Sequence, residues 1–349
     1  MKLRKIVTSI VLAGALAVSS FALTSCSSEE TVTIRVFNWG DFIDEDVLDM
    51  FTQETGIKII YDTFDSNETM YTRIQNTSYD VIFPSDYMVA RLMREDMLYE
   101  LDLDNIPNFS NIGERFKGRA YDPDDRYSVA YKWGTLGILY NTTMVNEPVD
   151  SWEIMWNPEY AGQIFMYSSM RDSLSAALSK LGYSINTNNI DELNEARDLL
   201  IAQRPLVQAY LGDDVKDKMI AGEGALALVY SGDALYTQTY NQDLNYAIPK
   251  EGSNVWFDTM AIPKNARQKT EAEAFINFML RPDIAAMNTE YIGFTTANVE
   301  ALALIDPDMA NNPIFWPTDE EYNRCTVHLD LGDFTKEFDR AFTEVMAAR

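Results

Sequence analysis

The sequence has few histidines, cysteines and basic residues, and each shortage argues against a class of function. One histidine, His328, and two cysteines, Cys26 and Cys325, are too few for a zinc site built from histidine and cysteine ligands. Lys and Arg number 28 against 54 Asp and Glu, so the formal net charge is −26. Such an acidic surface repels nucleic acid and anionic lipid headgroups. We therefore expect no nucleic-acid partner and no metal centre.

Motifs of nucleophilic and nucleotide-dependent enzymes are also missing. The sequence has no Gly-x-Ser-x-Gly elbow and no glycine-rich loop that could cradle a phosphate. Paired carboxylates, which glycoside hydrolases use, are available, and aromatic rings can stack on sugars. We expect no cofactor and no catalytic residues, and a secreted carboxylate-dependent glycosidase stays open as the enzymatic alternative.

Residues 1–25 have the features of a secretory signal and not of the fold. A basic start precedes an apolar run from Ile6 to Leu23, and the segment leads into Leu23-Thr24-Ser25-Cys26. This ending resembles the bacterial lipobox, in which cleavage exposes the cysteine for lipidation; an ordinary signal peptide or a transmembrane helix is the alternative. Cleavage removes three basic and no acidic side chains, so the charge becomes −26 − 3 = −29. Cys325 is then left unpaired, and we expect it to be buried.

Strand and helix patterns alternate from residue 31 onward. An alternating run rich in Val, Ile and Phe, Thr31 to Asn38, predicts a strand, and Ile57 to Tyr61 predicts a second. Between them, apolar residues at helical spacing from Phe42 to Phe51 predict a helix that ends at Gly56. Strand, helix and strand at this spacing make a βαβ unit, which favours a parallel sheet and the α/β class.

The same rhythm starts afresh near Gly134, and 349 residues suffice for two domains. Further strands are expected at 79–83, 127–140, 162–167, 225–230, 244–248 and 255–263. One further helix is expected to begin at Ser66, and another, after Tyr167, is expected to end at Leu181. Others are expected at 89–98, 190–203, 270–280 and 334–346. Gly134 and Gly137 are expected to break the strand at 127–140.

Four predicted strand ends carry an aromatic residue with a carboxylate close by. The pairs are Trp39 with Asp41, Tyr87 with Asp86, Tyr230 with Asp233, and Trp256 with Asp258, and Asp172 follows a fifth strand within one short loop. In open α/β sheets, ligands collect beyond the carboxyl ends of the strands. The recurrence therefore predicts a binding site, although any single pair is also explained by a core ring beside a solvated acid.

The chemistry of these pairs favours a cationic ligand with an apolar body. Several buried carboxylates in one site need a counter-charge, because an unpaired buried charge is costly. A cation over an aromatic face contributes about 0.5–2 kcal/mol, and each methylene removed from water contributes about 0.8 kcal/mol. A chain of methylenes that carries ammonium groups satisfies both requirements, while a neutral sugar remains the alternative ligand.

Six short motifs occur in a fixed order along the chain. They are Phe37-Asn38-Trp39, Glu54-Thr55-Gly56-Ile57-Lys58, Asp65-Ser66-Asn67-Glu68-Thr69-Met70-Tyr71, Pro249-Lys250-Glu251-Gly252, Asp258-Thr259-Met260-Ala261-Ile262-Pro263 and Leu280-Arg281-Pro282-Asp283. Together they resemble the bacterial spermidine/putrescine-binding proteins, the substrate-binding components of polyamine ABC transporters, over essentially the whole chain after Cys26.

The resemblance implies a two-lobed periplasmic-binding-protein fold with the ligand in a cleft between the lobes. Lobe 1 would comprise residues 31–133 and 257–303, and lobe 2 residues 134–256 and 304–349. The family's ligand contacts carry over to Trp39, Asp41, Phe42, Ser85, Tyr87, Asp172, Tyr230, Asp233, Trp256, Asp258, Phe294 and, less directly, His328.

Several of these positions depart from the spermidine-type pattern. Phe42 and Phe294 stand where tyrosines occur in that pattern, and Ser169 replaces an additional acid. Ser169 and Asp233 favour putrescine, whereas Tyr87 favours spermidine, so the pattern leaves the length of the ligand open.

The resemblance as a whole implies a monomeric, lipid-anchored extracytoplasmic protein, attached through Cys26. It would bind putrescine and/or spermidine and deliver the ligand to an ABC transporter permease. A carbohydrate-binding transport protein is the alternative within the same broad class.

Overall fold

The computed structural model describes residues 32–40 and 42–348. The predictions for the signal segment, for lipidation of Cys26 and for Asp41 concern residues outside these ranges. The chain from Thr33 onward forms one compact unit. Within the described residues, no helix is both long and apolar enough to cross a membrane. Cys325 is a buried free thiol, as predicted, and burial raises its pKa to about 12.

The strands form one mixed sheet. They are β1 (Thr33–Trp39), β2 (Lys58–Phe64), β3 (Val81–Ile82), β4 (Ser128–Asn141), β5 (Ile164–Tyr167), β6 (Val207–Leu211), β7 (Leu226–Tyr230), β8 (Leu244–Ala247), β9 (Val255–Ala261) and β10 (Thr295–Thr296). Their order is β2-β1-β3-β9-β4-β7-β5-β6, and β8 and β10 also pair with β4. β1 and β2 are parallel, which confirms the predicted βαβ unit.

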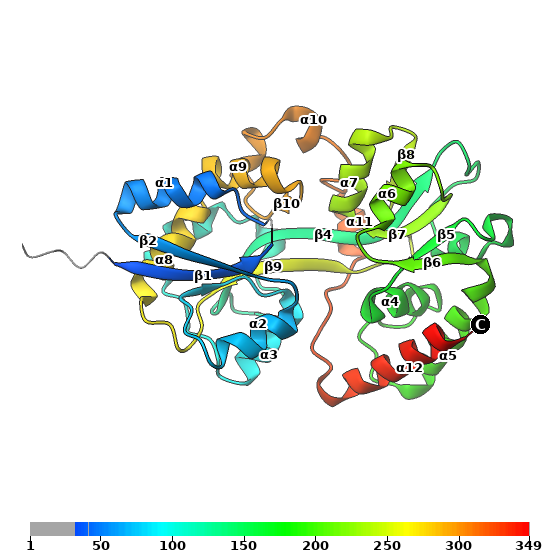
Figure 1. Cartoon of the computed structure of the whole chain (residues 1–349), viewed down its shortest axis with the longest axis horizontal. Helices are drawn as coiled ribbons and strands as arrows, with labels where there is room; N and C mark the ends of the chain where they lie inside the picture. The colour runs from blue at the N-terminus through cyan, green and yellow to red at the C-terminus, as the bar shows by residue number, and fades with distance from the viewer. Residues whose placement is uncertain (1–31, 41, 349) are drawn as a thin grey trace, which may run out of the picture. The chain divides into compact units, whose positions relative to one another are not determined.

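The long strands β4 and β9 connect the two halves of this sheet. They pair antiparallel from Ser128 opposite Ala261 to Thr135 opposite Val255, and Figure 1 shows them side by side. The predicted break of β4 at its glycines is wrong, because the strand continues through both. A Cβ at Gly134 would lie 2.7 Å from Trp256 Cζ2, and one at Gly137 would lie 2.5 Å from Tyr246 Cζ. The lack of a side chain at these two glycines therefore leaves space for the rings of Trp256 and Tyr246, which pack against β4.

The helices cover both faces of the sheet. They are α1 (Glu45–Thr55), α2 (Asn67–Ile74), α3 (Asp86–Arg94), α4 (Met170–Lys180), α5 (Ile190–Gln203), α6 (Val215–Ile220), α7 (Ser231–Tyr240), α8 (Lys269–Met279), α9 (Pro282–Ile292), α10 (Pro307–Ala310), α11 (Asp319–Asn323) and α12 (Thr335–Ala347). In Figure 1, α6 and α7 lie on the opposite side of β5–β7 from α4, α5 and α12.

Local signals explain several helix ends. The Asp44 side chain caps α1 by accepting from the backbone N–H of Asp46, and Gly56, with φ 73°, closes the helix as predicted. The Ser66 side chain caps α2 by accepting from the backbone N–H of Thr69. Prediction was less accurate for the helix expected at 89–98. The corresponding helix, α3, begins at Asp86 and ends at Arg94, so both of its ends lie earlier in the chain than expected.

Buried apolar side chains form three clusters. The first includes Phe37, Phe51 and Phe257 and packs β1, β3 and β9 against helices such as α1, and we call the elements around it the first lobe. The second includes Leu174 and Phe338 and packs α4, α5 and α12 against β5 and β7, and we call these elements, together with α6 and α7 on the other side of the same strands, the second lobe. A third cluster packs α7 and β7 against α9 and the segment 301–315. The third cluster therefore joins α7 of the second lobe to α9.

Two strands and five helices were not expected from the sequence: β6, β10, α6, α7, α9, α10 and α11. Their apolar periodicity is weak. α7, for example, contains Gly232, several Thr and Tyr residues and no capping hydrogen bond from a side chain. Since most helical stability in proteins comes from packing, such a helix is formed by its contacts with neighbouring elements.

Candidate functional site

Asp258 is held in the first lobe by a chain of uncharged hydrogen-bond partners. It lies in β9 two residues after Trp256, so both side chains emerge on the same face of the strand. The Asp258 side chain is buried, and its Oδ1 accepts a hydrogen bond of 2.6 Å from the Ser85 hydroxyl. Asn67 fixes Ser85, because its amide donates to Ser85 Oγ (3.0 Å) and its Oδ1 accepts from the Ser85 backbone N–H (3.1 Å).

The charge of this carboxylate is left without a compensating cation in the described part of the chain. Burial raises the pKa of Asp258 to about 7, and the Ser85 hydroxyl is the one group that lowers it. Desolvation penalises the ionised form of a carboxyl, and a neutral hydroxyl offsets only part of that penalty. A ligand cation next to Asp258 would therefore stabilise its ionised form.

Asp86, next to Tyr87, has a different role from the one that its sequence position suggested. Its Oδ1 accepts from the backbone N–H of Tyr87 (2.7 Å), and its Oδ2 accepts from the backbone N–H of Phe257 (3.2 Å). Burial raises its pKa to about 8, and the nearby Asp258 also raises it. Because both oxygens hold the backbone, Asp86 joins the start of α3 to β9 and is a structural carboxyl.

Asp172 is the corresponding carboxylate of the second lobe. It lies in the first turn of α4, where the Ser169 side chain caps the helix by accepting from the Asp172 backbone N–H. Asp172 Oδ2 accepts a hydrogen bond of 2.7 Å from the Tyr230 hydroxyl. Burial raises the pKa of Asp172, and the neighbouring Arg171 lowers it less. Like Asp258, this buried carboxylate has a hydroxyl as its side-chain partner.

A run of aromatic rings starts at Tyr230, the partner of Asp172, and includes Trp256, which precedes Asp258 by two residues in β9. The ring centroids of Tyr230 and Trp256 are 5.9 Å apart, those of Trp256 and Phe294 are 5.3 Å apart, and those of Phe294 and Phe42 are 6.0 Å apart. These rings come from β7, β9 and the segments beside α9 and α1, which lie far apart in the sequence. The fold thus gathers predicted site residues into one continuous group, which we call the ring run.

The ring run includes a close contact between the lobes. Phe294 lies against Gly232 of α7, where a Cβ would meet Phe294 Cε1 at 2.0 Å. No side chain fits at residue 232 while Phe294 keeps this position. The contact therefore requires glycine at residue 232, and the two lobes are in close contact at this point.

Comparisons with known proteins show the family of this chain. Residues 46–317 match the family model described as bacterial extracellular solute-binding protein. The chain belongs to this family. It is 33% identical over 344 residues to the spermidine/putrescine-binding periplasmic protein of Escherichia coli, and the match covers 97% of this chain and 98% of that protein.

Solved structures share the fold of this chain. The spermidine/putrescine ABC transporter substrate-binding protein PotD of Streptococcus pneumoniae is 38% identical, with a TM-score of 0.85 and coverage of 91% of this chain and 99% of the other. A lipoprotein of Treponema pallidum is 28% identical, with a TM-score of 0.82 and coverage of 90% and 99%. The predicted resemblance and the predicted two-lobed α/β fold are confirmed, as is the expectation of a transport protein and not an enzyme.

Tyr87 and Trp39, two other predicted contacts of this solute-binding protein, have their partners within the first lobe. Tyr87 donates from its hydroxyl to Glu68 Oε1 at 3.2 Å, and Glu68 follows Asn67 in α2. Trp39 ends β1 half-buried, with its ring 4.6 Å from that of Phe64. The structure records no contact that joins Trp39 to the ring run, so its role as a ligand contact stays a prediction.

His328 is buried beside α4. Its Nε2 lies 2.9 Å from the Ser175 hydroxyl, and Ser175 follows Asp172 by three residues in the same helix. Burial lowers the pKa of His328 well below its ordinary value, and the nearby Arg171 lowers it further. The side chain is therefore neutral, and the hydrogen bond to Ser175 satisfies one of its ring nitrogens.

Asp233 differs from the other predicted carboxylates because the protein supplies its cation. Lys216 Nζ lies 3.4 Å from Asp233 Oδ1. Burial raises the pKa of Asp233, and Lys216 lowers it. The sequence contained no signal for this pair, since α6 and α7 were not predicted. Asn67 could have been found, because it lies within one of the motifs that carried the resemblance.

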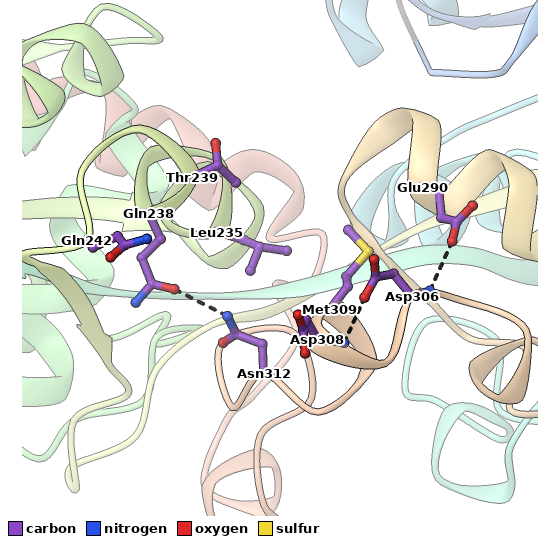
Figure 2. A pocket seen from close by; sticks show the side chains of 9 residues that line it. All are labelled: Leu235, Gln238, Thr239, Gln242, Glu290, Asp306, Asp308, Met309 and Asn312. Carbon is purple, nitrogen blue, oxygen red and sulfur yellow. Dashed lines mark hydrogen bonds between the residues drawn. The ribbon is translucent and has the colours of Figure 1, made fainter.

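A separate hollow of about 760 Å³ lies between α7 and the segment from α9 to α10. Figure 2 shows its lining, in which Asn312 donates a hydrogen bond of 3.2 Å to Gln238 and the Asp306 backbone N–H donates to Glu290. None of the residues predicted to contact ligand lines it. Across the described residues, no group of three or more His, Cys, Asp or Glu could hold a metal ion.

Proposed function

We propose that this protein binds a polyamine outside the cytoplasmic membrane and delivers it to the permease of an ABC transporter. One observation carries the proposal: Asp172 and Asp258, each buried with a hydroxyl as its side-chain partner, lie next to two neighbouring rings, since Asp172 accepts from Tyr230 and Asp258 follows Trp256 by two residues in β9. A ligand with two separated ammonium groups would supply both missing charges. The names of the E. coli and S. pneumoniae relatives support the choice of ligand class.

The roles of the site residues follow from their contacts. Asp258 and Asp172 would accept hydrogen bonds from the terminal ammonium groups, because charge-assisted hydrogen bonds are the strong ones. Trp256, Tyr230 and Phe294 would flank the methylenes, where each methylene removed from water contributes about 0.8 kcal/mol. The remaining proposed contacts are Trp39, Asp41, Phe42, Ser85, Tyr87 and His328, whereas Asp233 is paired with Lys216.

Ligand binding would be coupled to closure of the lobes. Asp258 belongs to the first lobe and Asp172 to the second, so a ligand that binds both stabilises the arrangement in which the lobes are close. For the lobe boundaries we keep residues 31–133 and 257–303 for lobe 1, and 134–256 and 304–349 for lobe 2.

Membrane attachment through a lipid on Cys26 is part of the proposal. The sequence around Cys26 supports it, and the T. pallidum structure is that of a lipoprotein. A single monomer anchored in this way would present its ligand to the permease at the outer face of the membrane.

A thermal-shift screen of the purified protein tests the proposed ligand class. We expect putrescine, cadaverine or spermidine to raise the melting temperature, since a ligand at one hundred times its Kd stabilises the folded state by about 2.7 kcal/mol. Neutral sugars should leave the melting temperature unchanged. Stabilisation by a sugar and by none of the polyamines would contradict the proposal and favour a carbohydrate-binding transport protein.

Polyamine affinity should rise with pH between pH 6 and pH 8. Burial raises the pKa of Asp258 to about 7, so its carboxyl is mostly protonated at pH 6 and ionised at pH 8. A bound ammonium requires the ionised form, so binding at pH 6 must first release a proton. One such proton predicts a Kd about tenfold lower at pH 8, while an alkyl ammonium, like that of lysine, keeps its charge.

Calorimetric titrations at pH 6, 7 and 8 measure this dependence directly. Repeating the pH 6 titration in buffers of different ionisation enthalpy reports the released proton. Asp258→Asn should remove the contribution of this one proton, because the amide does not titrate, and the part of the dependence that is left would report Asp172 and Asp86, whose pKa values burial also raises. An affinity that stays constant or falls from pH 6 to pH 8 would rule out Asp258 as the titrating anchor.

A further inference from the structure

The second lobe contains an ion pair next to the proposed ligand site. Asp233 lies in the first turn of α7, and Lys216 lies near the start of α6. Lys216 Nζ is 3.4 Å from Asp233 Oδ1, and the Asp233 side chain is 10% exposed while that of Lys216 is 28% exposed. The pair is thus only partly screened by solvent, and its two charges largely cancel.

Neighbouring contacts place this pair beside the ring run. Gly232, which precedes Asp233, is the residue against which Phe294 packs. Tyr167 lies beside the pair as well: its ring centroid is 5.3 Å from that of Tyr230, and its hydroxyl donates to Asp213 Oδ1 at 3.4 Å. Burial raises the pKa of this hydroxyl, and the negative charges of Asp233, Asp213 and Asp172 raise it further. Asp233 and Asp172 therefore act on the same tyrosine, at the same end of the site.

The carboxylates of the site divide into two kinds on the basis of their partners. Within the described part of the site, Asp258 and Asp172 accept from hydroxyl groups, whereas Asp233 already pairs with an ammonium. A ligand amine near Asp233 would have to displace Lys216 or lie close to its positive charge. Like charges placed together oppose binding and are a common source of specificity.

We propose that Lys216 is a specificity-determining residue: its ammonium occupies the position at Asp233 that a third ligand amine would need, so the site favours a diamine over a triamine. The inference rests on the proposed polyamine function and adds the preferred number of amines. The ammonium of Lys216 thus takes the place of a third ligand amine and neutralises Asp233.

Titration calorimetry with putrescine, a diamine, and spermidine, a triamine, tests this role through the ratio of the two Kd values. The wild-type protein should bind putrescine more tightly. Lys216→Met leaves Asp233 free for the third ammonium and should shift the ratio toward spermidine by tenfold or more. Lys216→Arg retains the positive charge and should keep the wild-type preference.

Two further variants provide matched comparisons. The double variant Lys216→Met/Asp233→Asn lacks both the lysine and the carboxylate with which it pairs. Its ratio of putrescine to spermidine Kd should therefore return to within about threefold of the wild-type ratio. Lys218→Met removes a lysine of the same helix whose Nζ donates to Glu223 at 2.7 Å, and this variant should leave the ratio unchanged.

Each outcome bears on a separate claim. If the wild-type protein binds both amines and Lys216→Met shifts the ratio no more than Lys218→Met does, Lys216 has no part in specificity and only this inference fails. A wild-type preference for spermidine of tenfold or more would overturn it equally. If the folded wild-type protein binds neither amine, the proposed function fails and the inference fails with it.

Discussion

Asp258→Asn should weaken putrescine binding by well over tenfold. The substitution keeps the shape of the side chain and an oxygen that can accept from Ser85, but it removes the one negative charge that the described residues leave for the ligand in the first lobe. A tenfold loss corresponds to about 1.4 kcal/mol, and truncation of one partner of a buried charge pair costs about 2–5 kcal/mol. Titration calorimetry at pH 8, where the wild-type carboxylate is ionised, measures the loss.

The fold of this variant should survive, because burial raises the pKa of Asp258 to about 7 and thus already disfavours its charge. Asp339→Asn is the matched control, since it removes the same charge from an exposed position in α12. We expect the control to bind within twofold of wild type. Equal affinities of Asp258→Asn and wild type would show that the ligand amine lies elsewhere.

Gly232→Ala should prevent the close approach of the two lobes and weaken polyamine binding by at least tenfold. The new methyl group would meet Phe294 Cε1 at 2.0 Å, well inside van der Waals contact, and Phe294 is itself packed between the rings of Phe42 and Trp256. Overpacking of this kind costs about 1–3 kcal/mol. The cost falls on the closed arrangement alone, because the clash joins residues of different lobes.

The helix that carries the substitution should tolerate it. Alanine is a better helix former than glycine by about 1 kcal/mol, and no positive φ is recorded at Gly232. Small-angle scattering with and without putrescine should therefore find a folded protein whose dimensions change less on binding than those of the wild type. Calorimetry on the same samples gives the affinity.

A second substitution separates the clash from other effects. Phe294→Ala removes the ring that the methyl group would meet, so Gly232→Ala combined with Phe294→Ala should bind no worse than Phe294→Ala alone. Gly212→Ala is the control, because a Cβ there meets nothing closer than Ser168 Oγ at 3.8 Å. Wild-type affinity in Gly232→Ala would contradict the contact between the lobes.

Much of the fold could be predicted because its signals are local. Thr31 to Asn38 and Ile57 to Tyr61 were expected as strands of a βαβ unit, and β1 and β2 are indeed parallel neighbours. The helix predicted at 190–203 coincides with α5. Periodicity, caps and C-terminal glycines act within a few residues, so they can be read without knowledge of distant partners.

The site could be predicted in part, through the recurrence of aromatic and acidic residues at strand ends. Trp256, Tyr230, Phe294 and Phe42 do form one run of rings, and Asp258 and Asp172 are buried beside it. Asp86 was indistinguishable from them by sequence position, since what separates it from a ligand contact is its pair of hydrogen bonds to the backbone of α3 and β9.

By itself, the sequence determined the α/β class, the order of the main strands and helices and the chemical character of the site, because each depends on residue types at short spacing. The tertiary structure alone decided which acids have a hydroxyl group as their side-chain partner and which has a lysine. Asp258, Asp172 and Asp233 look alike in the sequence, yet two are held by hydroxyl groups and the third by Lys216. A carboxylate's partner is chosen by packing between distant elements, and short-range patterns contain no information about that choice.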